Sequence, residues 1–327
     1  MHTLQSIEAS ASMLPDLAAI RAAQTRIAPH VHRTPVMSCR SLDDATGARL
    51  FFKCENFQKV GAFKARGATN AVFSLTDEEA RHGVVTHSSG NHGAALAYAA
   101  ARRGLPAWVV MPENASPAKI DNVRRYGATI RLCAPTVAAR EVACAEVRAA
   151  TGATLVHPFD DARVIAGQAT AALELLEDVS DLDVVIAPVG GGGLLSGTAI
   201  VARSMHPPIE VHGAEPANAD DAARSLASGK VEPIAPTVTL ADGLRTTLSP
   251  RTLHALRKHV VSIGLASEAG IVDAMRQTWQ RMKIVIEPSS AVPLACLLER
   301  TLAFPGRRVG IIISGGNVDL DRLPWWS

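Results

Sequence analysis

Cysteine and aromatic residues are scarce in this chain of 327 residues, and neither sign of charge prevails. The five cysteines are odd in number and none has C-x-x-C spacing, which disfavours a disulfide framework or a zinc site and suits a reducing cytoplasm. Aromatic residues make up only 4% of the chain, and 33 basic residues face 31 acidic ones with no basic block. Base-stacking platforms are therefore scarce and no basic block suits a nucleic-acid backbone, so we expect no nucleic-acid partner.

Long apolar runs are also absent, since no run approaches the ~20 residues of a membrane span. The segment 1–16 has no basic start followed by an apolar core, so we expect no signal peptide and no membrane association. The hydrophobic content of 47% is nevertheless enough for a large core. These features together predict a cytoplasmic α/β enzyme.

Short apolar segments alternate with helical ones along most of the chain, which predicts βαβ units and parallel sheets. The segment 183–188 is uninterruptedly apolar, as expected for a central strand covered on both faces. The segment 224–246, with two prolines, is predicted to be irregular. The expected strands are 50–54, 83–87, 107–111, 129–132, 183–188, 210–214 and 308–313. The expected helices are 14–27, 67–75, 94–101, 117–126, 138–150, 161–176, a helix from 194, 267–282 and 287–298.

Polar or glycine-rich loops follow three of the predicted strands: S-S-G-N-H-G at 88–93, G-G-G-G at 190–193 and S-G-G-N at 314–317. Ligands of doubly wound sheets bind at the carboxyl ends of strands. We therefore expect the three loops to converge on one cleft.

The four glycines between a strand and a helix place several backbone N–H groups near a helix N-terminus without side chains in the way, which indicates a phosphate cradle. The alternative is a flexible turn. No Lys-Ser/Thr follows, which excludes a Walker loop, and Leu195 occupies the position where a dinucleotide fingerprint needs glycine. The cradle is predicted to hold a single phosphate.

Lys64 stands between Phe63 and Ala65, just ahead of an alanine-rich helical run. A lysine that acts as a covalent nucleophile needs partial desolvation, so that its free amine is reachable near neutral pH. Taken alone, such a lysine is usually an ordinary surface residue. A phosphate cradle together with a desolvated lysine suggests pyridoxal 5′-phosphate (PLP) bound to the lysine.

The motifs A-F-K-A-R-G-A, S-S-G-N-H-G, V-G-G-G-G, A-E-P and S-G-G-N resemble, in the same order, those of the fold type II PLP enzymes of the threonine dehydratase and serine racemase group. The segments E-P-S-S-A-V-P-L-A and G-G-N-V-D-L-D near the C-terminus are especially similar to those of 3-hydroxyaspartate dehydratases. The resemblance spans nearly the whole chain. It implies an α/β fold (PLP fold type II, tryptophan synthase β-like) with two open, twisted, mostly parallel sheets flanked by helices.

The resemblance also implies roles for individual residues. Lys64 matches the lysine that binds the cofactor and moves the α-proton, and Phe63 the residue packed beside the cofactor ring. Asn91 matches the residue that hydrogen-bonds the phenolic oxygen, and Ser314 the one facing the pyridine nitrogen. A hydroxyl there suits elimination more than transamination. The residues expected to hold the phosphate are Gly190, Gly191, Gly192, Gly193 and Leu194.

The substrate α-carboxylate is expected to bind Ser88, Ser89, Asn91 and His92, although His92 also fits a plain helix-start residue. Ser89 matches the acid/base that serine racemase places opposite its lysine. Related dehydratases carry serine there too, so Ser89 fits both reactions. Arg140 matches an arginine near the substrate pocket and would grip a second substrate carboxylate bidentately. The alternative is a surface helix arginine.

The segment from Glu215 to Asp221 resembles the divalent metal site of the same group. The carboxylates of Glu215 and Asp221 and the carbonyl of Ala219 would supply hard oxygen ligands for Mg²⁺, Mn²⁺ or Ca²⁺. Without the resemblance, these acidic residues would be interpreted as a solvated turn.

The predicted activity is that of a PLP-dependent dehydratase, or ammonia-lyase, which removes water from a β-hydroxy amino acid and yields an oxo acid and ammonia. We expect 3-hydroxyaspartate as the first substrate, before serine and threonine. The alternatives are a serine or aspartate racemase using Lys64 and Ser89, and a non-catalytic PLP-binding protein. The predicted large domain comprises 1–74 and 153–327, the small inserted domain 75–152, and the family suggests a homodimer.

Overall fold

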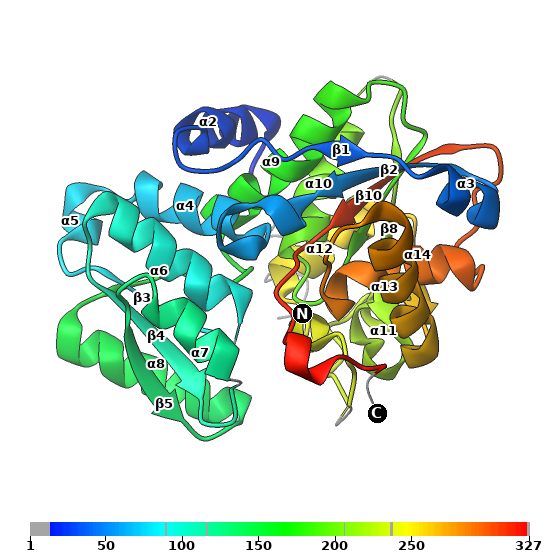
Figure 1. Cartoon of the computed structure of the whole chain (residues 1–327). Helices are drawn as coiled ribbons and strands as arrows, with labels where there is room; N and C mark the ends of the chain where they lie inside the picture. The colour runs from blue at the N-terminus through cyan, green and yellow to red at the C-terminus, as the bar shows by residue number, and fades with distance from the viewer. Residues whose placement is uncertain (1–13, 89, 116, 206, 236–237, 326–327) are drawn as a thin grey trace.

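The computed structural model describes residues 14–325 except Ser89, Ser116, His206 and residues 236–237. The chain builds two mostly parallel α/β sheets side by side (Figure 1), as the sequence predicts. The larger sheet has the order β1-β2-β10-β7-β8-β9, and every neighbouring pair is parallel except β1 with β2. Its strands are β1 Val36–Met37, β2 Arg49–Cys54, β7 Val184–Pro188, β8 Glu210–Pro216, β9 Ser262–Ala266 and β10 Arg308–Ile313.

The smaller sheet has the order β5-β4-β3-β6 and is parallel throughout. Its strands are β3 Val84–His87, β4 Ala107–Pro112, β5 Thr129–Cys133 and β6 Thr154–Leu155. The larger sheet therefore takes its strands from both ends of the chain, and the smaller sheet from the segment between them. The division into domains at residues 74 and 152 stays a prediction, and β6 extends the smaller sheet to Leu155.

Helices cover both sheets (Figure 1). Those in the first half of the chain are α2 Leu17–Ile27, α3 Arg40–Thr46, α4 Lys64–Ser74, α5 Asp77–Ala80, α6 Asn91–Arg103, α7 Pro117–Arg124 and α8 Val137–Thr151. Those in the second half are α9 Ala162–Asp178, α10 Gly193–Arg203, α11 Asp221–Ser228, α12 Pro250–His259, α13 Glu268–Met282 and α14 Pro288–Leu298. Short 3-10 turns lie at Glu55–Phe57 (η1), Lys59–Gly61 (η2), Ala217–Ala219 (η3), Asp242–Leu244 (η4) and Leu320–Arg322 (η5).

Burial follows the predicted pattern. All five residues of β7 are buried, because the strand lies between β10 and β8 in the middle of its sheet. In α9, every residue from Val164 to Leu176 is buried, since α2, α4 and α10 all pack against this helix. Its start is fixed by Asp161, whose side chain accepts a hydrogen bond from the N–H of Arg163 at 2.8 Å.

Two predicted helices begin earlier than expected, and this places functional residues inside them. Helix α4 starts at Lys64 instead of residue 67, and α6 starts at Asn91 instead of residue 94. Both first turns contain polar side chains, which lack the apolar periodicity that predicts a helix. The first turn of a helix accepts such residues, because its backbone N–H groups have no partner within the helix. The prediction that 224–246 is irregular is wrong for its first part, which belongs to α11.

The helices α3, α5 and α12 and the strands β6 and β9 were not predicted. Helix α12 has a capping box in which Ser249 and Thr252 bond each other's backbone N–H groups, with Pro250 at its first position. That signal is present in the sequence. Across the described part of the chain, no helix combines the length and the apolar character needed to cross a membrane.

Candidate active site

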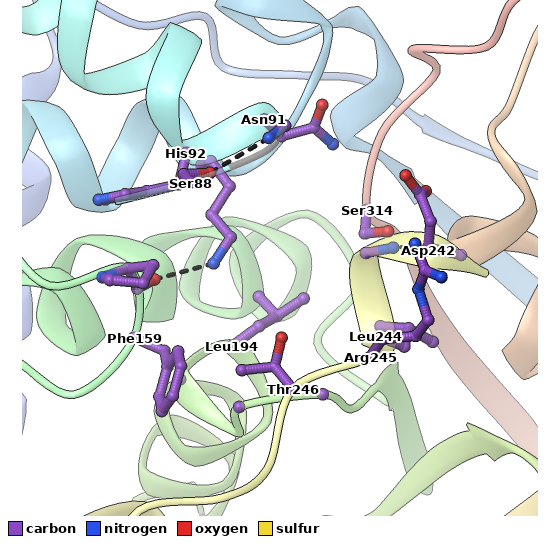
Figure 2. Close-up of a pocket in the computed structure, with 18 of the residues that line it drawn as sticks. Ser88, Asn91, His92, Phe159, Leu194, Asp242, Leu244, Arg245, Thr246 and Ser314 are labelled. Atoms are coloured by element: carbon purple, nitrogen blue, oxygen red, sulfur yellow. Dashed lines mark hydrogen bonds between the residues drawn. The ribbon is translucent and has the colours of Figure 1, made fainter. Parts of the chain in front are cut away.

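A cavity of about 340 Å³ is lined by loops of both sheets. Every predicted cofactor- and substrate-binding residue that the structure describes lines it, so the three polar loops do converge. Figure 2 shows Ser88, Asn91 and His92 along one side, Phe159 and Leu194 below them, and Ser314 near Asp242 on the other side. Ser89 lies outside the described residues.

Lys64 begins α4 and reaches into this cavity. Its Nζ donates a hydrogen bond to the carbonyl of Pro158 at 2.8 Å and lies 5.1 Å from the centre of the Phe63 ring. Burial lowers the pKa of the Lys64 amine to about 8, because the charged form loses hydration. The backbone N–H of Phe63 bonds the carbonyl of Ser314 at 2.9 Å, which ties the lysine to the end of β10.

The glycine loop forms a close-fitting cradle at the N-terminus of α10. A Cβ on Gly191 would stand 2.4 Å from the Phe159 ring, and one on Gly193 would stand 3.0 Å from Cβ of the same residue. Gly192 caps the helix with φ +85°, a backbone conformation that residues with a side chain rarely adopt. The first N–H groups of a helix have no partner within it, so this loop suits an anion such as a phosphate.

Asn91 is held by two partners that the sequence analysis did not assign. Its Nδ2 donates to both carboxylate oxygens of Glu287 at 2.9 and 3.1 Å, and its Oδ1 accepts from Asn317 Nδ2 at 2.9 Å. The orientation of the Asn91 amide is therefore fixed. Burial raises the pKa of Glu287 to about 7, against the opposing effect of the hydrogen bond from Asn91.

Ser314 lies at the end of β10 with only 3% of its surface exposed. Its hydroxyl is 3.0 Å from that of Ser290, which in turn donates to the carbonyl of Gly315 at 2.7 Å. Ser314 thus presents a neutral hydroxyl to the cavity, and the hydroxyl of Ser290 fixes its position.

Arg140 also lines the cavity, together with two histidines, His87 and His157, whose ring centres are 5.6 Å apart. Arg140 donates from Nε to the carbonyl of Thr136 at 3.4 Å. Burial, and then the charge of Arg140, lowers the pKa of His87. Burial together with His87 lowers the pKa of His157 to about 4, so both imidazoles are neutral at pH 7. Arg140 therefore carries a positive charge beside two neutral imidazoles.

His92 lines the cavity but is directed into the protein. Its Nε2 lies 3.2 Å from the carbonyl of Val156, and burial lowers its pKa well below the ordinary value. Because Nε2 must carry the proton to bond a carbonyl, Nδ1 is an acceptor. An acceptor does not favour a carboxylate, so the geometry suits the helix-start interpretation of His92.

Lys119 of α7 and Asp242 of η4 form an ion pair at the rim of the cavity. The pair joins a helix beside the smaller sheet to a short turn that lies between β8 and β9 of the larger sheet in sequence. The pair was not predicted, because isolated charges on helices and in loops are most often solvated. Glu287 was not predicted either, although that residue opens a segment already singled out for its resemblance.

The predicted metal ligands lie elsewhere, at the junction of β8 and α11. Glu215 and Asp221 are fully buried, and Ala219 is 1% exposed. Glu215 accepts the backbone N–H groups of Ala222 and Ala223 at 3.0 and 2.9 Å. Neither carboxylate oxygen of Asp221 has a hydrogen-bond partner among the described residues. Two buried oxygens without partners are a reason to expect a cation.

Comparison with known proteins agrees with this geometry. The family described as "Pyridoxal-phosphate dependent enzyme" matches residues 27–315. The β-hydroxyaspartate dehydratase of Paracoccus denitrificans (strain Pd 1222) is 53% identical, over 95% of this chain and 99% of that relative. The L-threo-3-hydroxyaspartate ammonia-lyase of Saccharomyces cerevisiae is 42% identical over 95% of both chains.

Among solved structures, maize serine racemase superposes with a TM-score of 0.91 and 48% identity over 94% of both chains. Lys64, the glycine cradle and Ser314 thus lie in one cavity of a fold shared with these relatives. The chain belongs to the family of pyridoxal-phosphate dependent enzymes and has their fold type II architecture.

Proposed function

We propose that this enzyme is a dehydratase that eliminates water from 3-hydroxyaspartate and releases ammonia and an oxo acid. The observation that carries the proposal is the cavity that holds the Lys64 amine, the glycine cradle and Arg140 together. The names of the two hydroxyaspartate-acting relatives support the choice of substrate.

The residues present fit PLP. The cradle at Gly190–Gly193 would hold its phosphate, Lys64 its aldehyde carbon, Asn91 its phenolic oxygen and Ser314 its ring nitrogen. Once bound, the cofactor would withdraw electrons from the α-carbon of the substrate. Glu287 and Asn317 would keep the Asn91 amide in one orientation.

Lys64 is suited to move the α-proton. With a pKa of about 8, roughly a tenth of its amine is unprotonated at pH 7 and about half at pH 8, so the free amine that a general base requires is within reach. The Pro158 carbonyl holds Nζ at a defined position in the cavity. Ser88, whose hydroxyl accepts the N–H of Gly90 at 3.3 Å, would bind the substrate α-carboxylate together with amides of the same loop.

Arg140 would bind the second carboxylate of the substrate. The adjacent imidazoles are neutral, so Arg140 supplies the positive charge there, and guanidinium pairs bidentately with carboxylate. Serine and threonine lack this carboxylate and would be weaker substrates.

A racemase acting on serine or aspartate is the second candidate, because maize serine racemase shares the fold at 48% identity. It would use Lys64 and Ser89 on opposite faces of the α-carbon. A divalent cation bound by Glu215, Asp221 and the Ala219 carbonyl, and a homodimeric assembly, are further parts of the proposal.

The test is turnover of the purified protein with the four 3-hydroxyaspartate stereoisomers, L-serine and L-threonine, with Mg²⁺ and with EDTA. Oxo acid and ammonia would be followed together with the chirality of the remaining amino acid. We expect fast oxaloacetate formation from one hydroxyaspartate isomer. Formation of D-serine from L-serine with little elimination would replace the proposal with the racemase.

A further inference from the structure

A group of buried charges lies behind the catalytic lysine, and the mechanism above does not use it. Arg66 follows Lys64 by two residues in the first turn of α4 and is the largest fully buried side chain described. Two residues on a helix are about 200° apart around its axis, so Lys64 and Arg66 leave the same turn in nearly opposite directions.

The Arg66 guanidinium is bound on all its sides. Nε and Nη2 donate to the two carboxylate oxygens of Glu55 at 2.7 and 2.8 Å. Nη1 and Nη2 donate to the two carboxylate oxygens of Glu174 at 2.8 Å each. Nη1 also donates to the hydroxyl of Thr170 at 3.1 Å. Two bidentate carboxylates fix a guanidinium in both position and plane.

Lys53 completes the group. Its Nζ lies 2.7 Å from Glu174 Oε2 and donates to the carbonyl of Thr34 at 2.7 Å. Lys53, Glu55 and Arg66 are fully buried and Glu174 is 5% exposed. These four residues, two cations and two anions, have a net charge of zero, and we call them the buried quartet. Asp178, 32% exposed and 3.8 Å from Lys53 Nζ, lies at its edge and is itself paired with Arg33.

The quartet joins the adjacent elements β2 and η1 to α4 and to α9, which begins nearly 90 residues after the end of α4. Close backbone packing adds to it, since a Cβ on Gly167 of α9 would stand 2.6 Å from the carbonyl oxygen of Arg66. The turn that carries Lys64 is therefore fixed from the side opposite the cavity.

We propose that Arg66 is a positioning residue for Lys64. Through the buried quartet it fixes the first turn of α4, and the opposite charges of the quartet largely offset one another's effect on the Lys64 amine. Removal of either sign of charge leaves an uncompensated buried charge, which acts over a long range because little water screens it.

The other ionisable groups around Lys64 do not mask the effect of a charge removed from the quartet. His92 on α6 and His157 after β6 have lowered pKa values and are neutral near pH 7. Glu287, Asp242, Lys119, Arg140, Glu141 and Arg245 line the same cavity and are unchanged in the variants proposed below.

The test compares Arg66→Met, Glu174→Gln and the double variant, each as holoenzyme. The readout is the pH titration of the visible absorption of the bound cofactor, with the pH profile of kcat/KM as a second measurement. Arg66→Met leaves the quartet with a net charge of −1 and should raise the midpoint by roughly half a unit to one unit. Glu174→Gln leaves the quartet with a net charge of +1 and should lower the midpoint. The midpoint of the double variant should return towards that of the wild type.

Two controls separate electrostatic positioning from folding. Thr170→Val removes a hydrogen bond to Arg66 without changing charge, and should lower the Tm but not move the midpoint. Arg308→Met breaks the 2.7 Å ion pair with Asp181 away from the cavity and should not move it either.

Midpoints that stay fixed, or that move in the same direction for Arg66→Met and Glu174→Gln, would overturn the proposal. If Arg66→Met does not fold, the comparison of Glu174→Gln with Thr170→Val decides, since only Glu174→Gln should shift the midpoint of the titration. The absorption titration needs no substrate, so this result is independent of the substrate proposed above.

Discussion

Arg140 is the side chain on which the substrate proposal depends most directly. A charge-assisted hydrogen bond contributes about 1.5–3 kcal/mol. We therefore expect Arg140→Ala to lower kcat/KM for 3-hydroxyaspartate by roughly 10- to 100-fold, mainly through KM, and to leave kcat/KM for L-serine nearly unchanged. Steady-state kinetics with both substrates measures this, with Arg140→Lys as the charge-conserving control. An equal loss for both substrates would place Arg140 outside the second carboxylate's site.

Glu215 and Asp221 provide a prediction about metal and pH. Burial, and then the neighbouring acids, raises the pKa of Glu215 to about 8, and burial raises that of Asp221 to about 6. Both values exceed those of the unfolded chain. The metal-free folded protein therefore binds more protons, and its stability should fall as the pH rises from about 4 to 8.

A bound divalent cation should remove this loss, because it stabilises the ionised carboxylates. We expect the Tm difference between protein with Mg²⁺ and protein with EDTA to grow from pH 5 to pH 8. Asp221→Asn should abolish the difference, whereas Asp220→Asn should retain it, since Asp220 pairs with Arg224 at 2.8 Å. A pH-independent Tm difference would speak against the site.

Individual site residues were predictable where a motif surrounds them. Lys64, the four glycines and Ser314 each lie in a short pattern after an apolar strand, and all line the cavity. Glu287 and Asn317 were not assigned, because their role depends on Asn91, more than 190 residues away along the chain. The direction of His92 into the protein was likewise decided by a contact with Val156.

Helices α4 and α9 cross at close backbone distance next to the turn that carries Lys64. A Cβ on Gly167 would stand 2.6 Å from both the Arg66 carbonyl oxygen and the Gly67 Cα. Overpacking of this kind costs on the order of 1–3 kcal/mol. We expect Gly167→Ala to lower the Tm by several degrees and to weaken cofactor retention, measured by thermal unfolding and by the visible absorption after dialysis.

Gly306→Ala is the matched control. It has φ +75° and no atom within 4 Å of the added Cβ, so its cost is confined to the backbone. It should lower the Tm without loss of cofactor. If Gly167→Ala keeps its cofactor as well as Gly306→Ala does, the crossing has no influence on the lysine.

Helices and strands followed from periodicity, but their ends did not always do so. The strand β7 and the helix α13, which Ser267 caps by accepting the N–H of Gly270 at 2.9 Å, lie where the sequence predicts them. Helices α4 and α6 extend N-terminally to include Lys64 and Asn91. These starts depend on tertiary contacts, such as the bond from the Phe63 N–H to the Ser314 carbonyl.

The contact between Lys119 and Asp242 is a feature of the whole molecule, because it connects α7, beside the smaller sheet, to the larger part across the cavity rim. The side chains are 28% and 41% exposed, and pairs of this kind contribute about 0–1 kcal/mol. We expect Lys119→Met to change KM by at most about fivefold and to leave the Tm nearly unchanged. High salt should reproduce the effect in the wild type. A large loss of kcat would indicate a direct role in the chemistry.

The sequence by itself determined the α/β class, the order of the strands along the chain and the motifs that predict a phosphate site beside a lysine. These are local properties, since periodicity and glycine content act within a few residues. Tertiary structure alone decided which distant groups meet: Glu287 with Asn91, and Arg66 with Glu55 and Glu174. A charge in a sequence has no fixed environment, and only folding determines whether water or an opposite charge surrounds it.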